Sequence, residues 1–273
     1  MSVTLIDGRP SDTVSVHDRG FQYGDGLFET MAVKNAAPLL WDRHMQRLKR
    51  GATRLGIILP DAQLMREEAE FVCRGTDRGV LKIILTRGLS GRGYAPINAS
   101  NTTRIVNLMP WPDYPNTHHS QGIAAQFCHI TITRQPDLAG IKHLNRLEQV
   151  MARRELAADC TEGLMLDERG HVIEGTMTNI FIVRQDALFT PDLSYSGVEG
   201  VMRSLVLDRV SELPMATSVT ELTKADIQEA DEIFLTNSLI GLWPIRRLAS
   251  REYPIGKHTR RIQEVIRDAC CVD

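Results

Sequence analysis

The stretch that decides the fold reads IKHLNRLEQVMARRELAADC, residues 141–160, followed by TEGLMLDERGHVIEGTMTNIF, residues 161–181. Lys142 stands just before apolar residues at helical spacing, which predict a helix that begins near it. Glu174 falls on the second arm of a predicted β-hairpin, whose turn is Glu168-Arg169-Gly170. The stretch therefore predicts a helix beside an antiparallel hairpin, each with one chemically useful side chain.

Lys142 and Glu174 have an ordinary interpretation as solvated surface residues, and spacing alone leaves it open. The lead-in to Lys142, LAGI, is small and apolar. Burial there would lower the pKa of the amine and free it as a nucleophile. Gly175 would let a ring approach the backbone beside Glu174. An amine and a carboxylate on neighbouring elements suit pyridoxal phosphate, because a lysine forms a Schiff base with its aldehyde and a carboxylate faces its ring nitrogen.

The whole chain has ordinary globular composition. It has 273 residues, 42% of them hydrophobic and 24% charged, with a formal net charge of -2. This length suits one large or two ordinary domains. Nothing in the charge pattern indicates a nucleic-acid partner or a membrane surface. No apolar run approaches the roughly 18 residues of a membrane span, and the start lacks a secretory pattern, so we expect a cytoplasmic protein.

The five cysteines show no metal-ligand spacing, and neither do the histidines, so we expect no metal site. Reduced thiols are the simplest interpretation. The adjacent pair Cys270-Cys271 leaves a redox role open. The sequence also contains no GxSxG elbow, no dinucleotide fingerprint and no Walker motif, which argues against serine hydrolases and nucleotide enzymes.

Residues 110–122, PWPDYPNTHHSQG, carry three prolines and no periodicity, and they predict an interdomain linker. We therefore expect a smaller N-terminal domain over residues 1–109 and a larger, cofactor-binding C-terminal domain over residues 123–273. Strand and helix patterns are mixed, with antiparallel hairpins, which favours two α+β domains.

Other segments predict local elements. Helices are expected from Asp42, from Pro60-Asp61, near Val201 and in the C-terminal tail, and strands over residues 80–86, 123–133 and 233–235.

A phosphate group needs its own cradle. GVEGVM, residues 197–202, precedes a predicted helix, and helix N-termini offer free N–H groups and a positive dipole end to a dianion. Arg47 is one of several arginines on the helix WDRHMQRLKRGATRL, and the planar fork of arginine suits phosphate. Arg92 and Tyr94, in the loop SGRGYAP, are candidates for substrate contacts. An ordinary helix start, solvated arginines and a polar turn are the alternatives.

These segments together resemble the class IV pyridoxal-phosphate enzymes, also called the fold-type IV group. The resemblance covers nearly the whole chain in the expected order. It is carried by DRGFQYGDGLFET (18–30), HMQRL (44–48), KHLNRLEQV (142–150), EGTMTNIF (174–181) and GVEGVMR (197–203). The resemblance implies an α/β (α+β-like) fold of two domains with pyridoxal 5'-phosphate between them, in a homodimer.

The resemblance also implies roles for individual residues. Lys142 becomes the Schiff-base lysine and Glu174 the partner of the pyridine nitrogen. Arg47 becomes a phosphate ligand. The remaining phosphate contacts fall to the N–H groups of Val201 and Met202 and to Asn237 and Ser238.

SGRGY and KHLNRLEQV are more similar to the lyase branch of the family than to its aminotransferases. That similarity implies an elimination that converts 4-amino-4-deoxychorismate into 4-aminobenzoate and pyruvate, a step toward folate. Arg92, Tyr94 and Phe21 are then the expected substrate contacts, with Arg92 for a substrate carboxylate. Two alternatives stay open: a class IV aminotransferase for D-amino acids or branched-chain amino acids, and a cofactor-binding module without catalysis.

Overall fold

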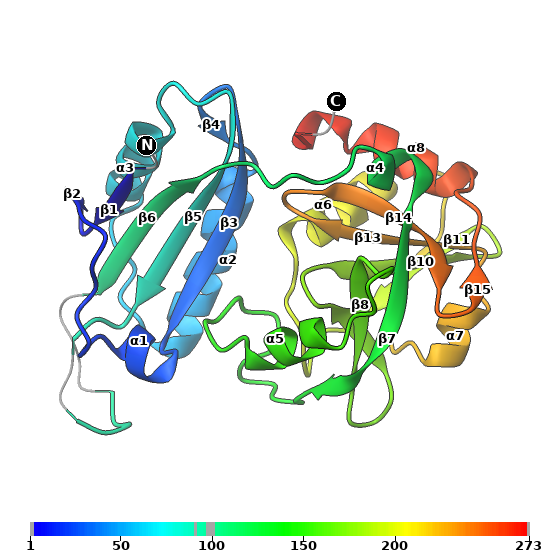
Figure 1. Ribbon diagram of the computed structural model, residues 1–273, viewed down its shortest axis with the longest axis horizontal. Helices are drawn as coiled ribbons and strands as arrows, with labels where there is room; N and C mark the ends of the chain where they lie inside the picture. Colours follow the sequence, from blue (N-terminus) through cyan, green and yellow to red (C-terminus); the bar gives the residue numbers. More distant parts are fainter. Residues whose placement is uncertain (1–2, 90–91, 97–101, 272–273) are drawn as a thin grey trace. The chain divides into compact units, whose positions relative to one another are not determined.

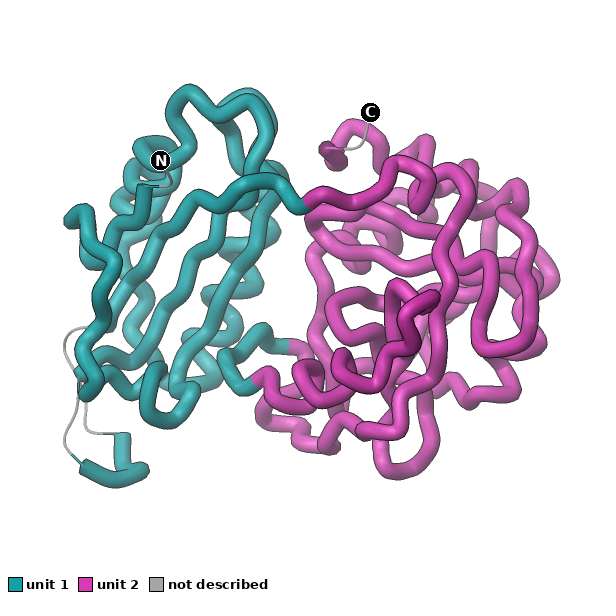
Figure 2. The backbone as a smooth tube through the Cα atoms, in the orientation of Figure 1, with its two compact units in different colours: residues 1–112, 141–145 teal, residues 113–140, 146–273 magenta. Residues whose placement is uncertain are grey.

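The chain folds into two compact units, shown in different colours in Figure 2. The computed structural model describes residues 3–89, 92–96 and 102–271. Unit 1 comprises Met1–Pro112 and Ile141–Asn145, and unit 2 comprises Asp113–Gly140 and Arg146–Asp273. The C-terminal domain expected from the sequence is therefore interrupted, because five of its residues, 141–145, pack with unit 1.

Within the described part of unit 1, six strands form a sheet in the order β2-β1-β6-β5-β3-β4, and all neighbouring pairs are antiparallel. Its strands are β1 (Thr4–Ile6), β2 (Arg9–Pro10), β3 (Gly26–Lys34), β4 (Ala37–Pro38), β5 (Arg78–Thr86) and β6 (Thr103–Met109). β5 contains the predicted strand over residues 80–86, whose apolar and β-branched side chains suit a buried strand. β5 lies inside the sheet, between β6 and β3.

The described helices of unit 1 are α1 (Arg19–Tyr23), α2 (Trp41–Leu55) and α3 (Ala62–Cys73). α2 packs on β3, and Figure 1 shows α2 and α3 on the same side of the sheet. Asp18 caps α1 by accepting hydrogen bonds from Gly20 N and Phe21 N. Asp61 caps α3 in the same way, at 3.0 Å from Leu64 N. The predicted helix starts at Asp42 and Pro60-Asp61 are thus correct to within one or two residues.

Among the described residues of unit 2, nine strands form a sheet. β12-β11-β10-β13-β14-β7-β8-β9 lie in that order, with β15 beside β14. Pairs β11–β12, β14–β7 and β7–β8 are parallel, and the rest are antiparallel. The strands are β7 (Ile123–Ile132), β8 (Glu162–Asp167), β9 (Val172–Gly175), β10 (Asn179–Arg184), β11 (Ala187–Pro191), β12 (Thr217–Thr220), β13 (Glu232–Asn237), β14 (Gly241–Leu248) and β15 (Arg251–Glu252). β8 and β9 form the predicted hairpin around residues 168–170.

Helices and a large apolar core complete unit 2. The helices are α4 (Thr117–Gln121), α5 (Leu147–Arg154), α6 (Val201–Val210), α7 (Lys224–Gln228), α8 (Lys257–Val265) and a short 3-10 helix, η1 (Arg267–Ala269). The core side chains come mainly from the central strands and include Leu164, Ile180, Leu235 and Trp243. In the part of the chain that is described, no helix has the length and apolar character needed to cross a membrane.

Two sequence-based expectations are corrected by these elements. The predicted linker, residues 110–122, contains helix α4, which packs on β14 of unit 2. The helix expected near Lys142 is α5, which begins only at Leu147. The reason is that backbone groups of residues 142–144 pair with β3 rather than with a helical turn.

Candidate active site

Lys142 is held against the beginning of β3 in unit 1. Its carbonyl oxygen accepts a hydrogen bond from Phe28 N at 2.9 Å, and Leu144 N donates to Gly26 O at 3.0 Å. His143 also forms an isolated bridge with Leu27. Lys142 Nζ lies 4.5 Å from the centroid of the Phe28 ring, a cation–π contact. The main chain of residues 142–144 is thus fixed on β3, and the amine of Lys142 lies over an aromatic face.

A buried polar network of Glu29, His44 and Arg47 lies in the same unit. Arg47 Nε donates to Glu29 Oε1 at 2.9 Å, and Arg47 Nη2 donates to Glu29 Oε2 at 2.5 Å. His44 Nδ1 lies 2.6 Å from Glu29 Oε2. β3 supplies Glu29, and the buried face of α2 supplies the other two side chains. A buried ion pair with a histidine beside it is stable this far from water only because its members bond to one another.

The same network shifts two pKa values. Burial alone would raise the pKa of the Glu29 carboxyl, but the charge and hydrogen bonds of Arg47 and the hydrogen bond of His44 lower it to about 2. Burial lowers the pKa of His44 below its usual value, and the charges of Arg47 and Lys142 add to that effect against Glu29. Glu29 is therefore ionised and His44 neutral at physiological pH. Lys142 is close enough for its charge to act on His44.

Glu174 is a buried carboxylate on β9 of unit 2. Its Oε2 accepts a hydrogen bond from Val198 N at 2.8 Å, and only 5% of the residue is exposed. Arg146 lies near enough for the charge of Glu174 to raise the pKa of its guanidinium, against burial, which lowers it. The carboxylate is thus oriented by a backbone donor, with a cation close by.

The loop before α6 is held by two hydrogen bonds, one to the backbone N–H of Val198 and one to its carbonyl oxygen. Val198 N binds Glu174, and Val198 O accepts from Asn179 Nδ2 at 2.9 Å. A Cβ on Gly200 would lie 1.9 Å from Asn179 Oδ1, so a larger residue here would force the Asn179 side chain to shift. Gly200 is also the N-cap of α6, where no side chain of the described residues forms a capping hydrogen bond. The first N–H groups of α6, including those of Val201 and Met202, therefore suit an anion.

Asn237 and Ser238 lie where β13 ends. Asn237 Oδ1 accepts from Leu239 N at 2.9 Å and from Ile240 N at 3.0 Å, and its Nδ2 donates to Met177 O at 3.2 Å. The side chain of Asn237 therefore shapes its own turn and ties it to the turn between β9 and β10. A phosphate contact from these two residues stays a prediction.

The three residues predicted to contact substrate are all exposed in the single chain. The exposed fractions are 74% for Phe21 and 84% for Tyr94, and Arg92 is exposed as well. Phe21 lies on α1, and the loop that carries Arg92 and Tyr94 is anchored by the buried Arg19, whose Nη1 and Nη2 donate to Gly93 O and Tyr94 O at 2.9 and 3.0 Å. Because Arg19 belongs to α1, these bonds hold the loop beside α1. Contact of Phe21, Arg92 and Tyr94 with a substrate stays a prediction.

Another buried carboxylate, Glu162, was not singled out by the sequence. It is fully buried on β8 and accepts hydrogen bonds from Thr176 Oγ1, from Thr178 Oγ1 at 3.1 Å and from Arg153 Nη1 at 3.2 Å. These bonds fix the turn between Glu174 and Asn179. Glu29 and His44 were missed for the same reason: only folding shows which polar residues of a motif are buried.

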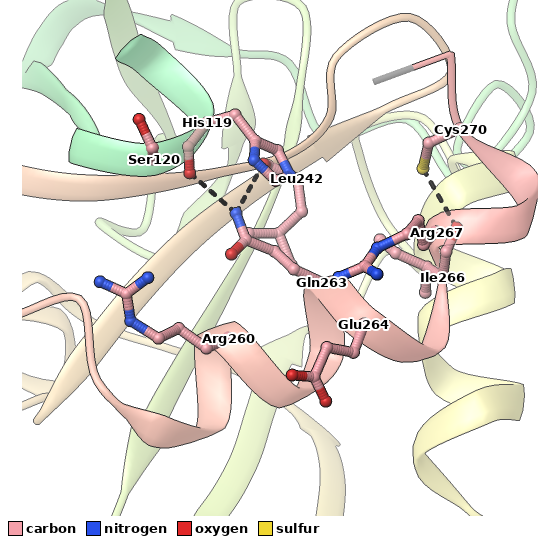
Figure 3. Close-up of a pocket in the computed structure, with 9 residues that line it drawn as sticks. All are labelled: His119, Ser120, Leu242, Arg260, Gln263, Glu264, Ile266, Arg267 and Cys270. Carbon is pink, nitrogen blue, oxygen red and sulfur yellow. Dashed lines mark hydrogen bonds between the residues drawn. The ribbon is translucent and has the colours of Figure 1, made fainter. Parts of the chain in front are cut away.

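A pocket of about 400 Å³ lies elsewhere in unit 2, between α4, β14 and the C-terminal helices (Figure 3). His119, Leu242, Gln263 and Cys270 help to line it, and Gln263 Nε2 donates to His119 O at 2.9 Å. None of the predicted site residues lines this pocket. Nowhere in the described ranges do three or more histidine, cysteine or acidic side chains form a group that could hold a metal ion.

Comparison with known proteins decides the family. Residues 26–248 match the family described as amino-transferase class IV. The chain belongs to the class IV aminotransferase family. An aminodeoxychorismate lyase of Vibrio harveyi is 35% identical over 94% of this chain and 97% of its own length. The crystal structure of 4-amino-4-deoxychorismate lyase from Pseudomonas aeruginosa has a TM-score of 0.94 and 44% identity, covering 97% of this chain and 98% of that one.

Aminotransferases of the family share the fold at lower identity. The branched-chain amino acid aminotransferase of Escherichia coli has a TM-score of 0.86 at 24% identity, a likeness that concerns the fold alone. These similarities confirm the predicted fold-type IV class. Class IV aminotransferases use pyridoxal phosphate, as the sequence predicts.

The side chains and backbone groups of this class IV chain fit that cofactor chemically. Unit 1 contains an amine for the aldehyde, Lys142, and a guanidinium for the phosphate, Arg47. Unit 2 contains a buried carboxylate for the ring nitrogen, Glu174, and a helix start without a side-chain cap at Gly200. This donor set matches the three polar regions of pyridoxal phosphate.

Proposed function

We propose that this protein is a pyridoxal-phosphate-dependent 4-amino-4-deoxychorismate lyase that forms 4-aminobenzoate and pyruvate for folate synthesis. The observation that carries this proposal is the 44% identity to the Pseudomonas aeruginosa lyase over nearly the whole of both chains. The identity to the Escherichia coli branched-chain aminotransferase, at comparable coverage, is only 24%. A difference of this size within one fold favours the lyase reaction.

Lys142 and Glu174 carry the chemistry in this proposal. When bound, pyridoxal phosphate takes up the electron pair released at the substrate carbon next to the amine. Lys142 Nζ would hold the cofactor aldehyde in the resting enzyme and would act as general base toward the substrate C4 proton. The Glu174 carboxylate, held by Val198 N, keeps a proton on the ring nitrogen. The C3–oxygen bond then breaks, the ring becomes aromatic, and Lys142 or a nearby water returns a proton to the departing pyruvate.

Several groups are proposed to bind the cofactor phosphate. Arg47 contributes a guanidinium edge, and Val201 and Met202 contribute N–H groups of the first turn of α6. Asn237 and Ser238 complete the set. Phe21, Arg92 and Tyr94 are proposed to contact the substrate, with Arg92 at one of its two carboxylates.

We also propose that the protein acts in the cytoplasm as a homodimer. The exposure of Phe21 and Tyr94 supports the dimer, because large side chains near a proposed substrate site are readily covered by a second copy. Sedimentation of the purified protein tests this point.

A class IV aminotransferase is the second candidate. It is favoured by the similarity to a D-alanine aminotransferase of Bacillus licheniformis, 28% identical over 88% of this chain. This candidate needs a 2-oxo acid as acceptor, whereas the lyase needs none. A binding module without catalysis would show the cofactor absorbance but no turnover.

One experiment separates these functions. The purified holoenzyme is incubated with 4-amino-4-deoxychorismate, and 4-aminobenzoate and pyruvate are measured without any 2-oxo acid. Parallel reactions contain D-alanine or a branched-chain amino acid with 2-oxoglutarate. Equimolar 4-aminobenzoate and pyruvate support the lyase. Brisk transamination with no 4-aminobenzoate contradicts it.

A further inference from the structure

One edge of the Arg47 guanidinium forms two hydrogen bonds with a single carboxylate. Nε and Nη2 of Arg47 both bond to Glu29, at 2.9 and 2.5 Å. Arg47 is 5% exposed and Glu29 is 1% exposed, so water competes little for either group. A bidentate pair of this kind fixes the plane of the guanidinium as well as its position.

His44 forms a hydrogen bond with the same carboxylate. It precedes Arg47 by one helical turn on α2, so both side chains face β3. Its Nδ1 lies 2.6 Å from Glu29 Oε2 and the residue is fully buried. An ionised carboxylate only accepts hydrogen bonds, so the proton of this bond belongs to His44 Nδ1. Glu29 is thereby held by two donors from α2 and has little freedom to rotate.

We infer that Glu29 and His44 are positioning residues, which hold the Arg47 guanidinium in the orientation that binds the cofactor phosphate. This inference rests on the proposed role of Arg47. Neither residue needs to touch the cofactor. A fixed guanidinium loses little conformational entropy when the phosphate binds, and such preorganisation raises affinity.

A positioning role and simple charge repulsion predict opposite effects of removing Glu29 on cofactor affinity. A carboxylate next to a phosphate site repels the dianion, so its removal would tighten cofactor binding if charge alone mattered. If Glu29 positions Arg47, its removal weakens binding. The sign of the change in affinity therefore tests the inference.

Unit 1 contains a matched control pair. Arg104 on β6 donates from Nε and Nη2 to Glu68 on α3, at 2.5 and 2.6 Å. Both residues are buried, as Glu29 and Arg47 are. Glu68 and Arg104 have no proposed role in cofactor binding, so loss of this pair measures what breaking a buried bidentate pair does to the fold alone.

The test compares Glu29→Gln, Glu68→Gln and Arg47→Lys with the wild-type holoenzyme. The dissociation constant of pyridoxal phosphate is measured by titrating apoenzyme, and the ³¹P NMR signal of the bound phosphate is recorded. We expect Glu29→Gln to raise the dissociation constant at least about tenfold and to move the ³¹P signal, with Glu68→Gln within about twofold of wild type. We expect melting temperatures to fall in both glutamine variants.

His44 has its own pair of variants. His44→Leu removes the donor to Glu29, and we expect about threefold to tenfold weaker cofactor binding. His44→Asn keeps a donor near the Nδ1 position and should restore much of the affinity. If Glu29→Gln does not fold, Glu29→Asp, which keeps the charge but shortens the reach, takes its place.

Two results overturn the inference: cofactor affinity in the Glu29 variant equal to or tighter than in wild type, or an equal loss in Glu68→Gln. Unchanged affinity in Arg47→Lys would instead contradict the proposed phosphate role of Arg47 itself.

Discussion

Lys142 is tied to Phe28 twice: Phe28 N donates to Lys142 O at 2.9 Å, and Lys142 Nζ lies 4.5 Å from the centroid of the Phe28 ring. The first contact fixes the backbone of the lysine to β3. The second places its amine over an aromatic face. The residues on either side of this segment, Gly140 and Arg146, belong to unit 2. The proposed nucleophile is therefore positioned by a pairing between distant parts of the sequence.

Lys142→Ala should fold, because the backbone bonds to Phe28 and Gly26 remain. We expect the cofactor absorbance of the Schiff base to disappear and turnover to fall by about 10³-fold or more, since nucleophile and general base are lost together. Lys82→Ala is the control, because Lys82 Nζ also lies over the Phe28 ring, at 5.3 Å. If only the Lys82 variant lost the absorbance band, Lys142 would not be the Schiff-base lysine.

Glu174→Gln should keep the cofactor but lose about 10²-fold or more in turnover, because a neutral amide does not hold a proton on the ring nitrogen. Absorbance titration reports binding, and release of 4-aminobenzoate reports turnover. The matched control is Glu168→Gln, an exposed glutamate in the turn of the same hairpin. Equal rates in the two variants would remove Glu174 from the mechanism.

Gly200→Ala should destabilise the protein by about 1–3 kcal/mol, as expected for overpacking, and weaken cofactor binding. The cause is the 1.9 Å approach of the new Cβ to Asn179 Oδ1. Urea unfolding of Gly200→Ala, Asn179→Ala and the double variant completes a mutant cycle. We expect the alanine to cost less when Asn179 is already truncated. Strict additivity of the two changes would contradict this contact.

Glu29 should make stability depend on acid pH. The pKa of its carboxyl is lowered from 4.5 to about 2, so its contribution is complete above pH 4.5 and is lost as pH falls toward 2. A shift of this size corresponds to on the order of 3 kcal/mol. Urea unfolding of wild type and Glu29→Gln should show a gap near pH 7 that narrows below pH 4.5. A gap that is constant with pH would show that ionisation of Glu29 does not stabilise the fold.

His44 should also make the protein less stable as pH falls, in a higher pH range than Glu29. Burial lowers its pKa below 6.5, so the unfolded chain takes up a proton first and wild-type stability begins to fall below pH 6.5. His44→Asn has no such proton to gain, and its stability should fall less between neutral pH and pH 5.

The buried cysteines should be unreactive in the native protein. Burial raises the pKa of Cys73 to about 11 and, with the charges of Glu155 and Glu162, that of Cys128 to about 12. Since only the thiolate reacts, we expect alkylation near pH 8 to spare both residues and to label the half-buried Cys160 first. Mass spectrometry of the labelled protein checks the order. Cys270 and Cys271 are buried, which does not favour the redox role left open by their spacing.

Much of the local structure follows from short-range patterns. Apolar spacing and caps predict α2, α3 and α6, and the Glu168-Arg169-Gly170 turn predicts the hairpin that carries Glu174. These signals are readable because a helix or a two-strand hairpin is determined mainly by neighbours in sequence. The predicted start of α5 fails at Lys142 because the competing partner, β3, lies far away in sequence.

The sequence by itself determined the family, the cofactor and the chemical types at the site, because a lysine, a carboxylate, an arginine and a glycine-rich helix start occur in the order that the family shares. Only the tertiary structure decided which of them have partners. It placed Lys142 on β3, paired Arg47 with Glu29 and fixed Glu174 through Val198. The physical reason is that burial and hydrogen-bond partners arise when strands from distant segments pair, and these determine the charge and orientation of each group.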